Sequence, residues 1–353
     1  MSGLGRRVLV AMSGGVDSSV AAALLARAGH EVEGVTLKLW GGESDTGCCA
    51  VSDTDDARRV ARRLGIPHHV FNYGAEFEAR VVEPYAAAHA AGRTPNPCVE
   101  CNRHLKFDAL LRRARLLGFD AVATGHHARI VTDDEGRPWL GRGADAAKDQ
   151  SYVLHMIGAG DLGDLLFPVG EMTKADVRRV AAELDLPTAA KADSQDVCFV
   201  TRADGRQAFL ADRIALHPAA VVDRDGRELG STDAVELVTI GQRRGLTLAG
   251  GAGRRYVTEV DVPGRRVVVG DRADLLVDAT PLVGMSWAAR PLEPGWPVQV
   301  QTSAHGTPRP AVWSAGGEVR WAEPAPRVAP GQAVVLYVDV GGHEVVAGGG
   351  TAA

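Results

Sequence analysis

AMSGGVDSSV, residues 11–20, directly follows the apolar run VLV at residues 8–10. The apolar run is typical of a buried strand, and the Ala- and Leu-rich residues after it predict a helix that ends at Gly29. Adjacent glycines between a strand and a helix allow a tight turn whose N–H groups point at an anion, and the helix N-terminus adds partial positive charge. The stretch therefore predicts a phosphate-binding loop, with a plain strand–helix turn capped by Asp or Ser as the alternative.

This loop lacks the lysine of the Walker A pattern, GxxxxGK followed by Ser or Thr. Ser13, Ser18 and Ser19 offer hydroxyl donors instead. Asp17 is expected beside a phosphate only where a divalent cation such as Mg²⁺ bridges the two. The loop therefore suits a magnesium-bound pyrophosphate better than a transferable γ-phosphate.

Strand and helix patterns alternate through the first half of the chain. Strand patterns at residues 31–40, 68–73 and 120–126 are separated by helical patterns. Thr173, three residues before Asp176, is expected to cap a further helix. This order predicts an α/β fold with a doubly wound parallel sheet and helices on both faces.

From about residue 205 the pattern changes to short Val-rich runs separated by Gly, Pro and Asp, which is typical of small β domains. We predict a catalytic domain over residues 1–204, a small β-rich domain over 205–278 and a β-barrel-like domain over 279–353. The final stretch GGGTAA is expected to fray.

The 353-residue chain has a net charge of −5, so a nucleic-acid partner would have to meet local basic patches. No apolar run is long enough to span a bilayer, which predicts a cytoplasmic location without a membrane partner. Five cysteines at irregular spacing argue against a disulfide scaffold and favour catalysis or metal binding. Cys48 and Cys49 have no partner at ligand spacing and are interpreted as incidental.

Cys98 and Cys101 form a C-x-x-C at the start of a predicted helix, within AGRTPNPCVECNRHLKF at residues 91–107. The helix dipole stabilises a thiolate there. Half of a zinc site, a structural pair and chance are alternatives, and no second C-x-x-C follows to complete a zinc site. Cys198, taken alone, has the pattern of a buried apolar cysteine.

SGGVDSS resembles the PP-loop of the ATP pyrophosphatases, which cleave ATP between the α and β phosphates. Together with six further stretches in the same order, the chain resembles the tRNA-specific 2-thiouridylase family within that group. The stretches are GRTPNP followed by CN at residues 92–102, ATGHHAR at 123–129, KDQSYVL at 148–154, LFPVGEMTK at 166–174, DSQDVCF at 193–199 and TIGQRRGL at 239–246. APGQAVVLY at 329–337 is a weaker match.

The resemblance implies 2-thiolation of the wobble uridine of tRNA. The uracil O2 would be adenylated by ATP with Mg²⁺, and sulfur from a protein persulfide would displace AMP, giving 2-thiouridine, AMP and pyrophosphate. The implied partners are tRNAs that read Lys, Glu and Gln codons and a sulfur donor such as a cysteine desulfurase or a sulfur-relay protein.

The resemblance also assigns roles by position. Cys101 corresponds to the nucleophilic cysteine and Cys198 to the cysteine that carries the persulfide. The implied ATP-binding residues are Ala11, Met12, Ser13, Gly14, Gly15, Val16, Asp17, Ser18, Leu37 and Gly125. The implied contacts with the target base or the tRNA are Asn96, Pro97, Cys98, His126, Lys148, Asp149, Gln150 and Gln332, to which we add Arg243 and Arg244 as phosphate contacts.

Three departures from the family pattern matter. Cys98 stands where some members have an aspartate that could act as a base near the thiols. No other residue of this sequence is an obvious candidate for that base. An Arg-Tyr pair of some members has no counterpart near Ser303 and Ala304. Leu37 replaces a frequent methionine of similar volume.

Two alternatives stay open at this point. One is a PP-loop ligase acting on a small metabolite, which would not need the β-rich third of the chain. The other is an iron–sulfur protein in which Cys98, Cys101 and Cys198 supply three ligands to a cluster that holds the sulfur.

Overall fold

The fold is described from a computed structural model. It describes residues 5–40, 51–193, 197–200, 205–248 and 254–353. Cys48 and Cys49 lie outside these residues.

The first half of the chain forms a five-stranded parallel sheet in the order β3-β2-β1-β4-β7. Its strands are β1 (Arg7–Ala11), β2 (Glu31–Lys38), β3 (His68–Asn72), β4 (Ala121–Thr124) and β7 (Leu165–Leu166). Successive residues of β1 point to opposite faces, so Leu9 joins one buried cluster while Val8 and Val10 join another. The predicted doubly wound sheet is confirmed, because both faces are covered.

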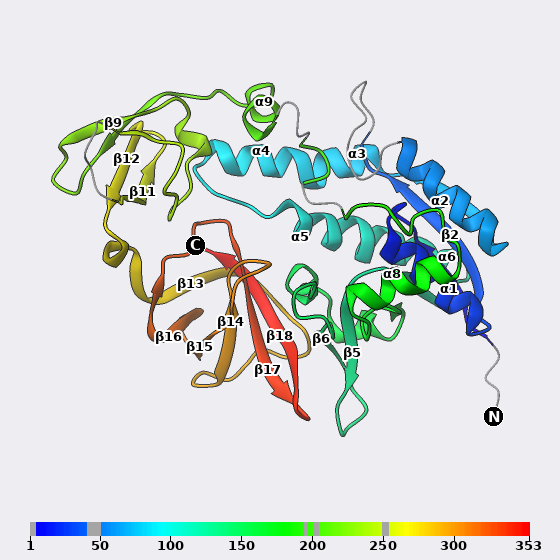
Figure 1. The fold of residues 1–353 in the computed structure, drawn as a ribbon. Coiled ribbons are helices and arrows are strands. Elements are labelled where there is room, and N and C mark those ends of the chain that lie inside the picture. The colour runs from blue at the N-terminus through cyan, green and yellow to red at the C-terminus, as the bar shows by residue number, and fades with distance from the viewer. Residues whose placement is uncertain (1–4, 41–50, 194–196, 201–204, 249–253) are drawn as a thin grey trace.

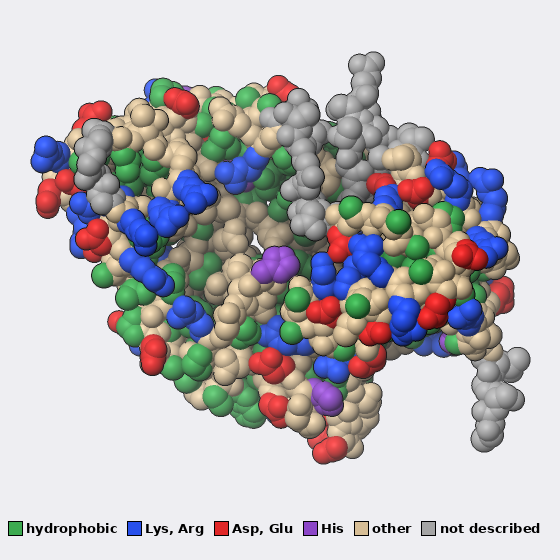
Figure 2. Space-filling model, in the orientation of Figure 1, with side chains coloured by type: hydrophobic (Ala, Val, Ile, Leu, Met, Phe, Trp, Pro, Cys, Tyr) green, Lys and Arg blue, Asp and Glu red, His purple; other side chains and the backbone are tan. Residues whose placement is uncertain are grey.

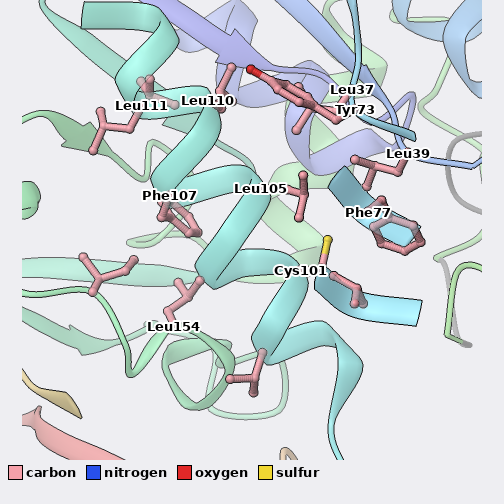
Figure 3. Close-up of a cluster of buried hydrophobic side chains, with 14 of the residues drawn as sticks. Leu37, Leu39, Tyr73, Phe77, Cys101, Leu105, Phe107, Leu110, Leu111 and Leu154 are labelled. Carbon is pink, nitrogen blue, oxygen red and sulfur yellow. The ribbon is translucent and has the colours of Figure 1, made fainter. Parts of the chain in front are cut away.

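One face carries α1 (Val16–Arg27), α2 (Val51–Leu64) and α8 (Lys174–Glu183), whose apolar residues pack with Val8 and Val10. The other face carries two longer helical stretches in succession. The first comprises α3 (Gly74–Phe77), a π-helical turn (Glu78–Val82) and α4 (Glu83–Ala90); the second comprises α5 (Pro97–Cys101), a π-helical segment (Asn102–Ala109) and α6 (Leu110–Leu116). Their apolar side chains, Cys101 among them, form the cluster shown in Figure 3.

A second sheet has the order β10-β9-β8-β12-β11 and a small Val-rich core of its own. Its strands are β8 (Ala219–Val222), β9 (Glu228–Thr232), β10 (Thr247–Leu248), β11 (Tyr256–Asp261) and β12 (Arg266–Gly270). The helix α9 (Gly205–Ala211) precedes it, and Figure 1 shows this sheet as a separate lobe.

The last six strands close into a barrel, since β13 pairs with both β16 and β18. They are β13 (Leu276–Trp287), β14 (Pro297–Gln301), β15 (Arg309–Ser314), β16 (Glu318–Pro326), β17 (Ala333–Val340) and β18 (His343–Ala352). The predicted pair of β-rich regions is therefore confirmed. The hairpin of β5 (Ala128–Thr132) and β6 (Pro138–Arg142) adds to the edge of β18, so one sheet contains strands from both halves of the chain.

The predicted fraying of GGGTAA is wrong, because residues 348–352 belong to the largely buried strand β18. A Cβ on Gly348 would lie 2.6 Å from the Ser286 carbonyl oxygen, and one on Gly349 would lie 2.5 Å from the His155 ring. The glycines thus allow close packing of β18 against its neighbours.

The domain boundaries at 204/205 and 278/279 stay a prediction. Among the described residues, no helix has the length and apolar character that crossing a membrane requires.

Candidate functional site

The site lies at the carboxyl edge of the parallel sheet, where the strand order reverses between β1 and β4. In doubly wound sheets this edge forms the ligand-binding crevice. The loop after β1 and the loop after β4 meet here, because a Cβ on Gly125 would overlap the amide nitrogen of Ser18. A glycine at position 125 therefore lets the two loops make backbone contact.

The loop after β1 has the geometry of an anion cradle. Gly14 has a φ of +72°, and a Cβ there would overlap the carbonyl of Asp53 in the first turn of α2. Gly15 is the extended residue before α1. The Ser18 hydroxyl accepts from the Ser13 amide at 3.2 Å and donates to the Gly15 carbonyl at 3.2 Å. The loop is thus held by its own serines at the N-terminus of α1.

Met12 and Leu37 lie beside this cradle. The Met12 amide donates to the Val35 carbonyl at 2.8 Å, and the Thr36 hydroxyl donates to the Met12 carbonyl at 2.8 Å. Both Met12 and Leu37 are buried, at adjacent strands near the carboxyl edge. Their predicted role in binding ATP stays a prediction.

Asp17, in the first turn of α1, is bound by two partners that the sequence argument did not pair with it. The Lys174 ammonium donates to Oδ1 at 2.8 Å and to Oδ2 at 2.7 Å, and His127 Nε2 lies 3.1 Å from Oδ1. Burial raises the pKa of the Asp17 carboxyl, but the hydrogen bonds from His127 and Lys174 outweigh it and hold this pKa below its ordinary value. Asp17 is therefore an ionised partner of a lysine in this structure.

Asp193 extends the same ion network. Its carboxylate lies 2.9 Å from the Lys174 ammonium, 2.9 Å from that of Lys148 and 2.7 Å from the Arg178 guanidinium. Burial raises the pKa of the Asp193 carboxyl, whereas the Lys148 and Lys174 ammonium groups lower it to about 2 overall. Three cations thus surround Asp17 and Asp193 at the edge of the cradle.

Asp149 and Gln150, predicted to contact tRNA, make contacts inside the protein. Asp149 accepts from the Gly143 amide at 2.9 Å, from the Ser151 hydroxyl at 2.8 Å and from Arg142 at 2.9 Å. The Gln150 side chain accepts from the His127 amide at 2.9 Å. In this structure both residues therefore position the loop that carries His127.

His126 is buried between the rings of Phe107 and Phe167, and its Nδ1 lies 2.7 Å from the Thr124 hydroxyl. Burial lowers the pKa of this imidazole well below its ordinary value. His126 is therefore a neutral ring in the wall of the site.

The first two cysteines of the site lie on α5. The Asn96 side chain caps this helix by accepting from the Cys98 amide at 3.1 Å, and Pro97 occupies the first turn. Cys98 is exposed, whereas Cys101, one turn later, is buried with its sulfur inside the cluster of Figure 3. Asn96 and Pro97 thus give the helix start that the sequence predicted.

Cys198 reaches the same cluster through its neighbour Phe199. The Phe199 ring lies 5.6 Å from that of Phe77 and 5.4 Å from that of Tyr85. Cys98 lies one turn before Cys101 on α5. Cys198 is half-buried against the cluster that contains Cys101. The three cysteines therefore lie around one apolar region of the molecule.

The loop that precedes α5 is held by both β-rich regions. The Thr94 amide donates to the Pro330 carbonyl at 2.7 Å, and Gln332 Nε2 donates to the Thr94 carbonyl at 3.0 Å. The Thr94 hydroxyl lies 3.1 Å from that of Thr239. Gln332 is thus a link between the barrel and this loop.

Arg243 and Arg244 are exposed and follow Thr239 closely in the chain. Their predicted role as phosphate contacts stays a prediction.

The sequence suggested two metal-containing groups, an iron–sulfur cluster on the cysteines and Mg²⁺ on Asp17. Within the described parts of the chain, no three His, Cys, Asp or Glu residues are close enough together to hold a metal ion. Cys98, Cys101 and Cys198 therefore do not fit an iron–sulfur cluster in this arrangement. Asp17 does not fit a Mg²⁺ ligand as it stands, because both of its oxygens accept from Lys174.

Sequence reasoning missed Lys174, His127 and Asp193 as partners of the loop. Lys174 and Asp193 each occur in a stretch that carried the family resemblance, and that is the signal that could have found them. No spacing rule pairs Asp17 with a lysine 157 residues away.

Residues 6–202 match the family described as tRNA methyl transferase HUP domain, and residues 207–271 match the one described as tRNA methyl transferase PRC-barrel domain. The chain is 50% identical to the tRNA-specific 2-thiouridylase MnmA of Chloroflexus aggregans, over 97% of each chain. It is 47% identical to the protein of the same name from Acidothermus cellulolyticus, over 94% of each chain.

Among solved structures, the chain resembles the U34-tRNA thiolase NcsA of Methanococcus maripaludis with its 4Fe-4S cluster. The TM-score is 0.37 and the identity 16%, over 59% of this chain and 65% of that one. This likeness is too distant to bear on function.

The domain descriptions mention methyl transfer, whereas the relatives that match nearly the full length are named for thiolation. Identity near one half over almost all of both chains is the stronger finding. The chain belongs to the tRNA-specific 2-thiouridylase family.

Proposed function

We propose that this protein is a tRNA sulfurtransferase that converts the wobble uridine of tRNA to 2-thiouridine at the expense of ATP. The observation that carries the proposal is that one parallel sheet supports two sites. An anion cradle stands at the start of α1, and thiols lie on α5 and beside Phe199 in the apolar cluster that covers the opposite face.

The first step uses the cradle. Uracil O2 attacks the α-phosphorus of ATP, the α–β bond breaks, and pyrophosphate leaves. The loop of residues 12–15 and the N-terminus of α1 would hold the departing pyrophosphate through backbone N–H groups and the Ser13 and Ser18 hydroxyls. ATP arrives as its Mg²⁺ complex, and this cation belongs to the substrate.

The second step uses the thiols. Cys198 would carry a persulfide received from a sulfur donor such as a cysteine desulfurase or a relay protein. The Cys101 thiolate attacks the Cys198 sulfur, releases the terminal sulfur as hydrosulfide, and leaves a Cys101–Cys198 disulfide. Hydrosulfide adds to C2 of the adenylated uracil and AMP departs. A dithiol reductant then returns two electrons to the disulfide.

The tRNA would lie across the hollow between the β-rich lobe and the rest of the molecule. Lys and Arg side chains border this hollow in Figure 2, which suits a phosphate backbone. Arg243, Arg244 and Lys148 would contact phosphates, while Asn96, Pro97 and Cys98 would approach the target base. Substrates would be the tRNAs that read Lys, Glu and Gln codons, in the cytoplasm.

Mass spectrometry of tRNA nucleosides tests the proposal. Cells that lack the protein should lose 2-thiouridine at the wobble position, and the wild-type gene should restore it. A Cys101→Ser gene should not restore it, and Thr232→Ser, a conservative change in β9 away from the thiols, serves as the control. Normal 2-thiouridine in the deleted strain would contradict the proposed function.

A further inference from the structure

The phosphate loop lacks a lysine in its own sequence, but a lysine occupies its edge in the folded molecule. The Lys174 ammonium lies 2.7 and 2.8 Å from the two oxygens of Asp17 and 2.9 Å from Asp193. Its side chain is only 13% exposed. The Lys174 ammonium is therefore enclosed beside the N-terminus of α1, which is a suitable position for a cation that binds phosphate.

The backbone of Lys174 is fixed by three independent contacts, so the placement does not depend on a flexible side chain. Thr173 and Asp176 form a reciprocal capping box at the start of α8. The Lys174 amide donates to Asp145 Oδ2 at 2.9 Å. Val177 of the same helix packs in the cluster that buries α1. Helices α8 and α1 are therefore held at a set separation, with the lysine between them.

Charged groups of both signs surround the Lys174 ammonium. The cations Lys148, Lys174 and Arg178 surround the carboxylates of Asp17 and Asp193. The α1 N-terminus adds partial positive charge on the same side. With Asp145 on the Lys174 amide, three carboxylates balance these three cations, so the helix N-terminus supplies the positive potential that favours a polyanion such as pyrophosphate.

A lysine ammonium has three N–H donors, and here they face Asp17 and Asp193. A phosphate oxygen must therefore replace one carboxylate contact. Asp193 keeps Lys148 and Arg178 after losing Lys174, whereas Asp17 keeps only His127. Because a half-buried carboxylate that loses its cation is costly, Asp193, which keeps two cations, is the partner that yields.

We propose that Lys174 binds the β- and γ-phosphates of ATP and the pyrophosphate product, and that Asp17 positions this lysine. The proposal rests on the proposed function and deepens it. It replaces the expectation that Asp17 acts by binding Mg²⁺.

Calorimetric titration tests this with inorganic pyrophosphate and with AMP as separate probes, in EDTA and in Mg²⁺. Lys174→Met should weaken pyrophosphate binding about 10- to 100-fold in both buffers, the range expected for one hydrogen bond to a charged group. AMP lacks the β- and γ-phosphates, so Lys174→Met should bind AMP with an affinity within about twofold of that of the wild type. A twofold change corresponds to less than about 0.5 kcal/mol of binding free energy.

Two further variants serve as a matched control and a conservative replacement. Arg179→Met removes a cation from the outer face of α8, where Arg179 pairs with Asp176 and Glu183, and should bind both probes like wild type. Lys174→Arg keeps the charge and should recover most of the lost pyrophosphate affinity. Equal pyrophosphate binding by wild type and Lys174→Met would overturn the proposal, and so would an equal loss of AMP and pyrophosphate in Lys174→Met at an unchanged melting temperature.

The two proposals fail differently. If wild type binds neither ATP nor pyrophosphate, the proposed function fails. If wild type binds both and thiolates tRNA while Lys174→Met binds pyrophosphate unchanged, only the role of Lys174 fails.

Discussion

At the residue scale, the environment of each cysteine separates two sulfur chemistries. Cys101 is buried in the apolar cluster, Cys198 is half-buried beside Phe199, and Cys98 is exposed at the helix start. In the persulfide route only Cys101 and Cys198 take part, because Cys198 carries the sulfur and Cys101 releases it as hydrosulfide. In the cluster route all three residues are ligands.

We therefore predict that Cys98→Ser keeps at least about a third of the thiolation rate, because the persulfide route does not use Cys98. A threefold loss of rate corresponds to less than about 1 kcal/mol of transition-state free energy. Cys101→Ser and Cys198→Ser should lose all measurable activity. Single-turnover thiolation assays, on protein prepared anaerobically with iron quantified, measure this. Loss of both iron and activity in Cys98→Ser would defeat the persulfide route.

The carboxylate of Asp193 gives a prediction about acid stability. Its folded-state pKa is lowered to about 2 from 3.8, so its ion pairs stabilise the fold above about pH 4 and are lost as the pH falls through 2. The free energy of unfolding should fall by on the order of 2 kcal/mol over this range from this group alone.

Urea unfolding of wild type and Asp193→Asn between pH 2 and pH 5, a span chosen to bracket the ordinary Asp pKa of about 3.9, measures the difference. The variant should lose less stability on acidification than wild type. Asp185→Asn, at an exposed carboxylate paired with Arg63, is the matched control and should follow the wild-type curve. If the free energy of unfolding depends on pH in the same way for Asp193→Asn and the wild type, Asp193 does not contribute to the loss of stability in acid.

At the scale of elements, the glycine run at residues 348–350 has the composition of a disordered terminus but forms part of strand β18. Gly348, Gly349 and Gly350 each face an atom of a neighbouring element within 2.6 Å of where a Cβ would lie. The strand pairs with both β13 and β17 and closes the barrel. The run is therefore a packing requirement.

Gly349→Ala should destabilise the protein by about 1–3 kcal/mol, the usual cost of overpacking, because its Cβ would lie 2.5 Å from the His155 ring. Chemical denaturation measures this. Gly316→Ala, in an exposed turn where the nearest atom is 4.0 Å away, should change stability by less than about 0.5 kcal/mol. A neutral Gly349→Ala would contradict the packing explanation.

At the scale of the whole molecule, both β-rich regions contact the loop before α5. Thr94 is bound from the barrel by Pro330 and Gln332 and from the second sheet by Thr239. The β-rich regions thus position the loop that carries the proposed base contacts. This gives them a role that a ligase for small metabolites would not need.

We predict that tRNA binding is strongly salt-dependent although the net charge is −5. Local cations would release counterions from the phosphates, so affinity should fall by at least about tenfold between roughly 50 and 200 mM salt. Filter binding or fluorescence anisotropy with a substrate tRNA measures the slope. Arg243→Ala with Arg244→Ala should make the slope shallower, whereas a flat wild-type response would contradict a basic binding surface.

The sequence by itself determined the elements and the chemical class. Apolar periodicity indicated the strands and helices of the doubly wound sheet, glycines and serines in fixed order indicated the cradle, and Asn96 and Pro97 indicated the start of α5. These features depend on neighbours within a few residues, which is the range over which backbone sterics, capping and periodicity act.

Only the tertiary structure decided which distant residues meet. The pairing of Asp17 with Lys174 spans 157 residues, and Gly348–Gly350 become a core strand only because β13 and β17 flank them. No local rule encodes these contacts, because they arise when the apolar faces of separate elements are buried together. For this reason the sequence left the cradle without its cation, and the fold supplied one.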